Sequence, residues 1–147
     1  MRSVLLLAMI LVGCGMDEQK QVIDERLKPM VLEFAADFGH VSSSVVVGPL
    51  NNGSLATCFD YKGSRTVYGE KAVNKVIFDE KYFDGLSPIM KKAIIFHELG
   101  HCQLNLEHSA EGDYTLTDPY IYTTESDYYE SNWSALVADL KFKAGRY

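Results

Sequence analysis

Positive charge is scarce in this sequence. Its 147 residues include 14 Lys and Arg against 20 Asp and Glu, for a formal net charge of −6. Proteins that bind nucleic acid present a basic surface to the phosphates, so this balance argues against a nucleic-acid partner. The sequence also lacks internal repeats and any long linker rich in Ser, Pro or Gly. The length is sufficient for one domain with a core of its own, and not for two.

Long apolar runs are missing, with one exception at the N-terminus. Residues 4–12 form an unbroken apolar run behind Met1-Arg2-Ser3, with the length of a signal-peptide core and too short to span a bilayer stably. Leu11-Val12-Gly13-Cys14 then resembles the lipobox of bacterial lipoproteins, in which a lipidated cysteine is the first residue after cleavage. The alternatives are an ordinary signal peptide, or a buried strand, with an incidental cysteine.

The lipobox resemblance implies a division of the chain and a location. We expect a lipoprotein signal peptide at 1–13, a lipidated Cys14 with a short tether at 14–20, and a single domain at 21–147. Such a protein is held in the bacterial cell envelope through its N-terminal lipid. Gly15, where an Asp would favour the inner membrane, implies the outer membrane. Cleavage removes the charge of Arg2 and takes the net charge from −6 to −7.

Histidine is also rare, and its distribution is uneven. Three of the four histidines, His97, His101 and His108, fall within twelve consecutive residues. The segment His97-Glu98-Leu99-Gly100-His101 matches H-E-x-x-H, a pattern that puts two zinc ligands on one face of a helix. Glu98 lies one step round the helix, where its carboxylate can act as general base on a metal-bound water. The pattern predicts a catalytic zinc (Zn2+) site.

The flanking residues predict where this helix begins and ends. Ser87 is suited to the N-cap, and Pro88 to the first helical position, where its missing N–H is not needed. Asn105 tolerates the left-handed conformation that ends many helices. We therefore predict a helix over about 88–104. The competing interpretation is a chance match on an amphipathic helix whose histidines are only packed or hydrogen-bonded.

A catalytic zinc needs a third protein ligand and one open position. If the chain turns at Asn105, it can bring His108 to the metal. Glu125 or Glu130, from a helix further along, could replace it, whereas Glu107 is too close to His108 to do so without changing the turn. His40 is expected at a helix end or on the surface, away from the metal.

Residues 97–108 resemble the metzincin metallopeptidases, whose longer motif is H-E-x-x-H-x-x-G-x-x-H. Leu104 stands where that motif has Gly, and His108 comes one residue late. The segment is more similar to a group of small bacterial metallopeptidases, many of them lipoproteins, with a pattern like HELGHC-x-L-x-R-x-H. Leu106 replaces the Arg of that pattern.

The resemblance implies an α+β, metzincin-like zincin domain: an N-terminal helix, a small mixed sheet, the HExxH helix and a C-terminal helix. Metzincins also carry a methionine turn of the form S-x-M-x-P-Y. Here Thr117 stands at the Met position, and no methionine follows Met90. Tyr120 or Tyr122, just after this altered turn, could donate a hydrogen bond to the oxyanion of the reaction.

The function implied is hydrolysis of peptide bonds in a peptide or protein substrate, with Glu98 activating a zinc-bound water. A second hypothesis is a non-catalytic envelope lipoprotein of the same fold that binds zinc structurally or presents a surface to a partner. A third is a purely structural envelope lipoprotein without metal. The intact Glu98 favours the enzyme, because a structural site has no need of a base.

Hydrophobic patterning predicts the remaining elements. We expect a helix over Gln21–Phe38, kinked or starting later because of Pro29. A strand at 45–47 should lead through a hairpin turn at Asn52-Gly53 to a strand at 55–61. Further strands are expected at 65–68 and 73–78, after a turn at 62–64. Thr124 should cap a last helix at 125–143, whose apolar stripe belongs to the core: Tyr129, Trp133, Leu136, Val137 and Leu140.

Cysteine occurs only three times. If Cys14 carries lipid, Cys58 and Cys102 remain as a pair that an oxidising envelope compartment can join in a disulfide. Such a bond would pin the metal helix to the sheet. In the alternatives, Cys102 is a soft zinc ligand, although it lies off the face that carries the histidines, or both cysteines are buried free thiols.

Overall fold

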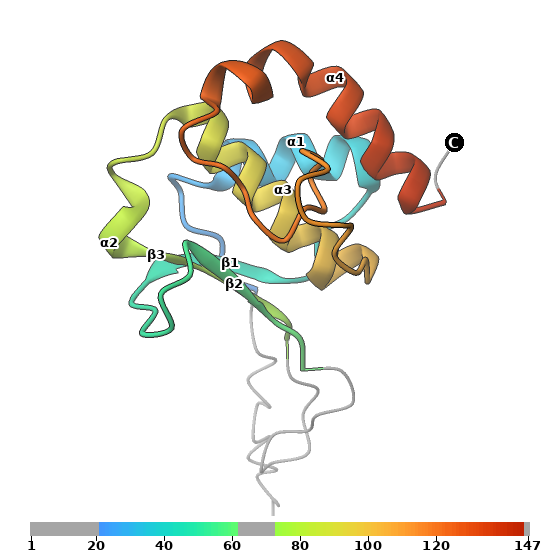
Figure 1. Ribbon diagram of the computed structural model, residues 1–147. Coiled ribbons are helices and arrows are strands. Elements are labelled where there is room, and N and C mark those ends of the chain that lie inside the picture. The colour runs from blue at the N-terminus through green and yellow to red at the C-terminus, as the bar shows by residue number, and fades with distance from the viewer. Residues whose placement is uncertain (1–20, 62–72, 146–147) are drawn as a thin grey trace, which may run out of the picture.

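Helices stack on one face of a small mixed sheet (Figure 1). The computed structural model describes residues 21–61 and 73–145. The elements are α1 (Lys28–Phe38), β1 (Ser44–Gly48), β2 (Ala56–Phe59), β3 (Lys75–Asp79), α2 (Glu80–Phe83), α3 (Pro88–Leu104) and α4 (Ser126–Lys143). Helix α3 lies at the centre, between the sheet on one side and α1 and α4 on the other. The predicted α+β class is confirmed, and the predicted elements that fall on described residues follow one another in the predicted order, but the short helix α2 was not predicted.

The sheet has the strand order β1-β3-β2. Strand β3 pairs in parallel with β1 and antiparallel with β2. The predicted hairpin is wrong: the chain does turn at Asn52-Gly53, where Gly53 has φ 79°, but β3 separates the two flanking strands. Strand β3 takes the centre because Val76 and Phe78 are both fully buried. The expected turn at 62–64 and strand at 65–68 lie outside the described residues.

Helix α1 begins at Lys28, seven residues after Gln21, where the predicted span begins. Pro29 sits in its first turn, where no backbone hydrogen bond is lost. Before it, Ile23 forms a parallel bridge with Val45, so this stretch extends along β1. Val31 and Phe34 bury the core-facing side of the helix.

Helix α3 has the predicted boundaries. The Ser87 hydroxyl accepts a hydrogen bond from the Met90 N–H at 3.4 Å, and Pro88 occupies the first turn. At the other end Asn105 is left-handed, with φ 56° and ψ 37°. The N–H of Leu106 then donates to the Gly100 carbonyl at 3.1 Å and closes the turn. Most of the helix is buried, as expected of an element packed on several sides.

Helix α4 covers the face of α3 that points away from the sheet. Its apolar stripe belongs to the core, as predicted. Tyr129 and Leu140 are fully buried, and the ring of Trp133 packs edge-on against that of Phe96, with 4.9 Å between the ring centroids. The predicted cap is wrong by one residue. Glu125, not Thr124, occupies the N-cap position, and no side chain caps the helix.

Helix α3 is covalently tied to the sheet. A disulfide joins Cys58 of β2 to Cys102 of α3, as predicted, with a Cα–Cα distance of 5.7 Å. Cys102 is buried in the core and is therefore a structural cysteine, not a metal ligand. Among the described residues, no helix has the length and apolar character required to cross a membrane. Cys14 and the predicted signal peptide and tether lie outside the described residues.

Candidate metal site

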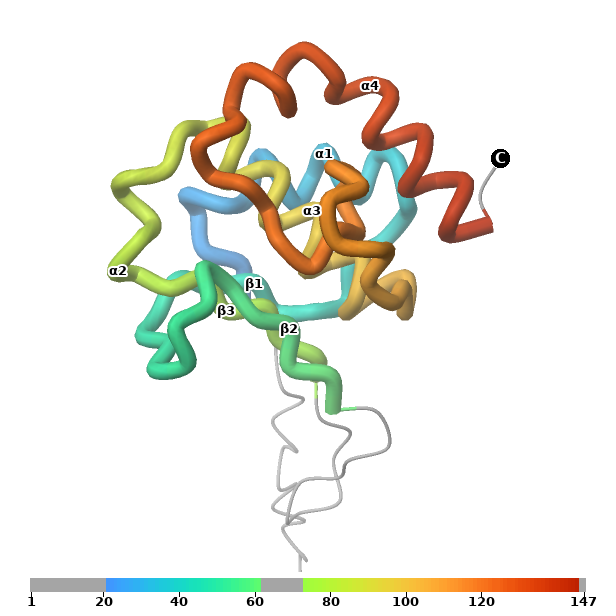
Figure 2. The backbone as a smooth tube through the Cα atoms, viewed as in Figure 1, coloured from blue at the N-terminus to red at the C-terminus, as the bar shows by residue number. Residues whose placement is uncertain are grey.

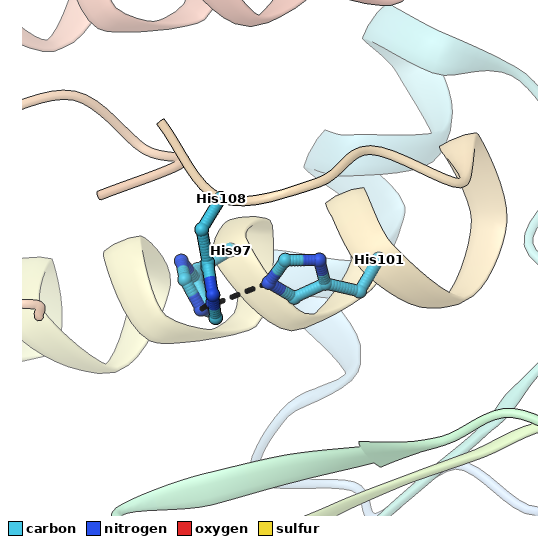
Figure 3. Close-up of side chains that lie close together, drawn as sticks. All are labelled: His97, His101 and His108. Carbon is cyan, nitrogen blue, oxygen red and sulfur yellow. Dashed lines mark hydrogen bonds between the residues drawn. The ribbon is translucent and has the colours of Figure 1, made fainter. Parts of the chain in front are cut away.

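Three imidazoles meet beside the middle of α3 (Figure 3). His97 and His101 come from successive turns of the helix, and His108 reaches back from the segment that follows it. The Nε2 atom of His97 lies 3.2 Å from that of His101 and 3.4 Å from that of His108. One nitrogen from each of the three rings lies within 4.8 Å of the others. The structure thus brings together the three histidines predicted from the sequence.

Backbone carbonyls fix the orientation of two of these rings. Nδ1 of His97 lies 3.0 Å from the Leu116 carbonyl, and Nδ1 of His101 lies 2.6 Å from the Leu106 carbonyl. A carbonyl only accepts, so each Nδ1 must carry the proton and donate it. Each Nε2 is then left with a lone pair. The contact between Nε2 of His97 and Nε2 of His101 brings two lone pairs together, which is favourable only with a cation between them.

Burial keeps these imidazoles neutral. Desolvation, together with the neighbouring His101, lowers the pKa of His97 to about 4 in the metal-free protein. Desolvation also lowers the pKa of His101, against the opposing effect of the Leu106 carbonyl. Neutral imidazole is the form that binds metal. Protons therefore compete weakly for the His97 and His101 nitrogens near neutral pH.

The spacing of the nitrogens fits a small tetrahedral ion. Two nitrogens bound to zinc at the usual length, with a tetrahedral angle between them, lie about 3.3 Å apart. The Nε2 atom of His97 lies at 3.2 and 3.4 Å from those of His101 and His108, and both distances match that separation. Three histidine nitrogens are also a donor set found in catalytic zinc sites, which keep a fourth position open. The donor set and its dimensions both fit zinc.

Glu98 lies in the same cleft as the three histidines and is 8% exposed. Burial raises the pKa of its carboxyl group to about 7, while a hydrogen bond from the Cys58 backbone acts in the opposite direction. A carboxyl group with a pKa near neutrality can both accept and return a proton under ordinary conditions. Cys58 thus contacts Glu98 through its backbone and α3 through its disulfide.

The cleft has a volume of about 570 Å³ and two distinct walls. One wall is residues 53–58, which comprise the turn before β2 and the first part of that strand. The other wall is residues 119–121 of the segment between α3 and α4. Tyr120 belongs to this second wall, and its side chain is 56% exposed. Tyr122, the alternative considered with it, is not among the lining residues and stacks on Tyr114 instead.

The other ligand candidates lie elsewhere. Among the described residues, the cluster that could hold a metal contains only the three histidines. Glu125 and Glu130 are exposed at the start of α4 and are not part of it. Glu107 lines the cleft without joining the cluster. His40 is exposed just after α1, as predicted.

Residues 105–120 form an irregular segment that crosses α3 on the side of the histidines (Figure 2). It supplies His108 and the two carbonyls that hold His97 and His101. The position aligned with the metzincin Met is Thr117, whose buried hydroxyl accepts a hydrogen bond from Lys143 at 2.7 Å. Sequence reasoning missed the two carbonyls, because a backbone acceptor has no residue signature. It also missed Asp118, although Asp-Pro is a recognised turn pair.

Neither a scan against protein-family models nor searches of curated proteins and of solved structures finds a match to this chain. The class of protein that the site indicates therefore rests on the side chains themselves: three convergent imidazoles and a buried carboxyl group in one cleft.

Proposed function

We propose that this protein is a zinc-dependent, metzincin-like peptidase that hydrolyses peptide bonds in peptide or protein substrates. The observation that carries the proposal is the convergence of three histidine Nε2 atoms beside a buried carboxyl group whose pKa is near 7. A site that only holds a metal has no need of such a carboxyl group in the same cleft. Glu98 is therefore the feature that favours an enzyme over a zinc-binding or partner-binding protein of this fold.

His97, His101 and His108 would hold the ion. When bound, zinc supplies a Lewis acid that makes water acidic near neutral pH and polarises a carbonyl group. Glu98 accepts the proton of the attacking water and passes it to the leaving amine. The Tyr120 hydroxyl, on the opposite wall of the cleft, donates a hydrogen bond to the oxygen on which negative charge develops. Its exposure leaves it free to move toward a bound substrate.

The wall formed by residues 53–58 supports a peptide as the substrate. Among the strands that the structure describes, β2 is an edge strand, paired on one side only with β3. An edge strand offers backbone N–H and carbonyl groups to an extended chain, which can pair with it as a further strand. A peptide aligned in this way would pass in front of Glu98 and the histidines.

The proposed location rests on the N-terminal sequence. We propose that lipid on Cys14 anchors the domain to the cell envelope, most simply at the outer membrane, with residues 15–20 as tether. Cys14→Ala should release the protein from the membrane fraction without changing the folded domain. A Cys14→Ala protein that still sediments with membranes would remove the lipid anchor from the proposal.

The test of the enzyme uses residues 15–147 and three measurements. Elemental analysis should find one zinc per chain. The zinc-loaded protein should cleave members of a broad fluorogenic peptide library. Glu98→Gln should keep the zinc and the fold but lose hydrolysis, because an amide cannot accept the proton. Zinc-loaded protein that cleaves no peptide would favour the binding protein, and protein without affinity for zinc would favour a structural envelope protein.

A further inference from the structure

Asp118 is a fully buried carboxylate in the segment that crosses α3. It follows Leu116, whose carbonyl holds His97, by two residues. Among the described residues, no Lys or Arg forms an ion pair with it. The nearby cation, Lys143, instead pairs with Asp139 and donates to the hydroxyl of Thr117. A buried charge without a counter-ion is costly and calls for a specific compensation.

Backbone N–H groups supply part of that compensation. Asp118 Oδ2 accepts from Gly112 at 3.0 Å and from Tyr114 at 3.1 Å, and Oδ1 accepts from Tyr120 at 2.9 Å. These bonds gather residues on both sides of Asp118 around one side chain. Tyr114 needs this support, since its φ of 52° is strained for a residue with a Cβ, whereas Gly112 adopts its φ of 85° freely. The carboxylate therefore shapes the turn from which the Leu116 carbonyl points at His97.

The carboxylate also acts on the metal cluster through its charge. Asp118 stands two residues after Leu116, whose carbonyl accepts from Nδ1 of His97 at 3.0 Å, so the buried charge lies close to this ligand. A dication held by three neutral imidazoles carries its whole charge into the protein. A buried anion close to the ligand His97 would offset part of it.

We propose that Asp118 is a positioning residue of the metal site: it folds residues 112–120 so that the Leu116 carbonyl orients His97, and it places a buried negative charge close to that ligand. This inference rests on the proposed zinc site. Outer groups that orient metal ligands typically change metal affinity by about 10- to 100-fold when replaced. The substitution Asp118→Asn should lower the zinc affinity by this amount. The amide has only one acceptor oxygen, whereas N–H groups approach both oxygens of the carboxylate, and the amide carries no charge.

The experiment compares Asp118→Asn with Asp79→Asn in the 15–147 protein. Asp79 is a matched control: it is 3% exposed and accepts the Lys81 N–H at 3.0 Å, but it caps α2 instead of bonding to the segment that covers α3. Zinc dissociation constants are measured by competition with a chromophoric chelator, and the geometry of the site by the visible spectrum of the cobalt(II) form. Asp118→Asn should weaken zinc binding by about 10- to 100-fold and alter the cobalt spectrum. Asp79→Asn should leave both unchanged, even where it lowers the melting temperature of the metal-free protein.

If Asp118→Asn is unfolded without metal, the zinc concentration that restores the fold provides the same comparison, because binding and folding are linked. A variant that remains unfolded at every zinc concentration would assign Asp118 to the fold alone and overturn the proposed role. Equal zinc affinity and spectrum in Asp118→Asn and parent would overturn it as well. A parent protein that binds neither zinc nor cobalt would overturn the proposed function itself. That failure is seen with the parent alone and is therefore distinct from a failure of the role of Asp118.

Discussion

The metal cluster is built from two unlike regions, the regular helix α3 and the irregular segment 105–120. In α3, the four-residue spacing of His97 and His101 is enough to place both rings on one face. Segment 105–120 has no repeating structure. Its groups are positioned by individual hydrogen bonds, which involve the Asp118 carboxylate, the Leu116 carbonyl and the Leu106 carbonyl. The helix therefore provides the spacing of the ligands, whereas the orientation of the rings comes from the segment that covers the helix.

Removing one ligand from each region should have the largest effect. His101→Ala and His108→Ala should each weaken zinc binding by more than about 100-fold, since replacing an outer orienting group alone costs about 10- to 100-fold. His40→Ala is the matched control and should bind zinc as the parent does, because His40 is exposed and outside the cluster. Competition titration with a chelator measures all three. Unchanged zinc content in His108→Ala would exclude the segment as a source of ligand and return attention to Glu125 and Glu130.

The disulfide attaches the helical region, and not the segment, to the sheet. Replacing both Cys58 and Cys102 by Ala should lower the free energy of unfolding by up to about 4 kcal/mol in the chain-entropy model for this loop length. Urea unfolding of the metal-free protein measures the loss. Mass spectrometry of unreduced, alkylated protein should find no free thiol at either position. Two alkylated cysteines in freshly prepared, oxidised protein would contradict the bond.

Glu98 belongs to the helical region and should make the stability of the metal-free protein depend on pH. Its pKa is raised by burial from 4.5 to about 7, so the folded state binds the proton more tightly than the unfolded state. The stabilising contribution of the neutral Glu98 carboxyl group to the free energy of unfolding is therefore fully present below about pH 4.5. It is lost as the pH rises through 7. At pH 8 the buried charge costs on the order of 3 kcal/mol.

Glu98→Gln removes this titration and should raise the melting temperature at pH 8 much more than at pH 5. His97 titrates in the opposite sense, since its lowered pKa removes stability as the pH falls from 6.5 toward 4. Its effect is common to the parent and the variant and cancels in their difference. A difference between the two melting curves that is independent of pH would contradict the raised pKa of Glu98.

The junction of the two regions should show the smallest effect. Asn105 is left-handed and ends α3, so Asn105→Ala should lower the free energy of unfolding by about 1 kcal/mol, while Asn105→Gly should be nearly neutral. Because the Leu106 carbonyl that holds His101 follows directly, Asn105→Ala should also weaken zinc binding slightly. Equal stability of the Ala and Gly variants would show that the left-handed turn is not what positions Leu106.

The same division explains what the sequence could predict. The boundaries of α3, the clustering of His97, His101 and His108, and the disulfide partners follow from local patterns: caps, spacing and cysteine number. The central place of β3 does not, because it depends on which apolar strand is buried most deeply, and Asn52-Gly53 indicates a turn without saying which strands pair. The roles of Asp118 and the Leu116 carbonyl depend on the irregular conformation of segment 105–120, which leaves no repeating pattern in the sequence.

The disulfide has a consequence for damage to the backbone. Cys58 and Cys102 enclose β3, α2 and most of α3, so a single proteolytic cut anywhere between them leaves two fragments that remain covalently joined. After any cut before residue 97, all three histidines and Glu98 lie on the C-terminal fragment. Strand β2, which belongs to the cleft wall formed by residues 53–58, stays linked to that fragment through Cys58. A nicked molecule would therefore migrate as a single species until it is reduced, with both walls of its cleft still attached to each other.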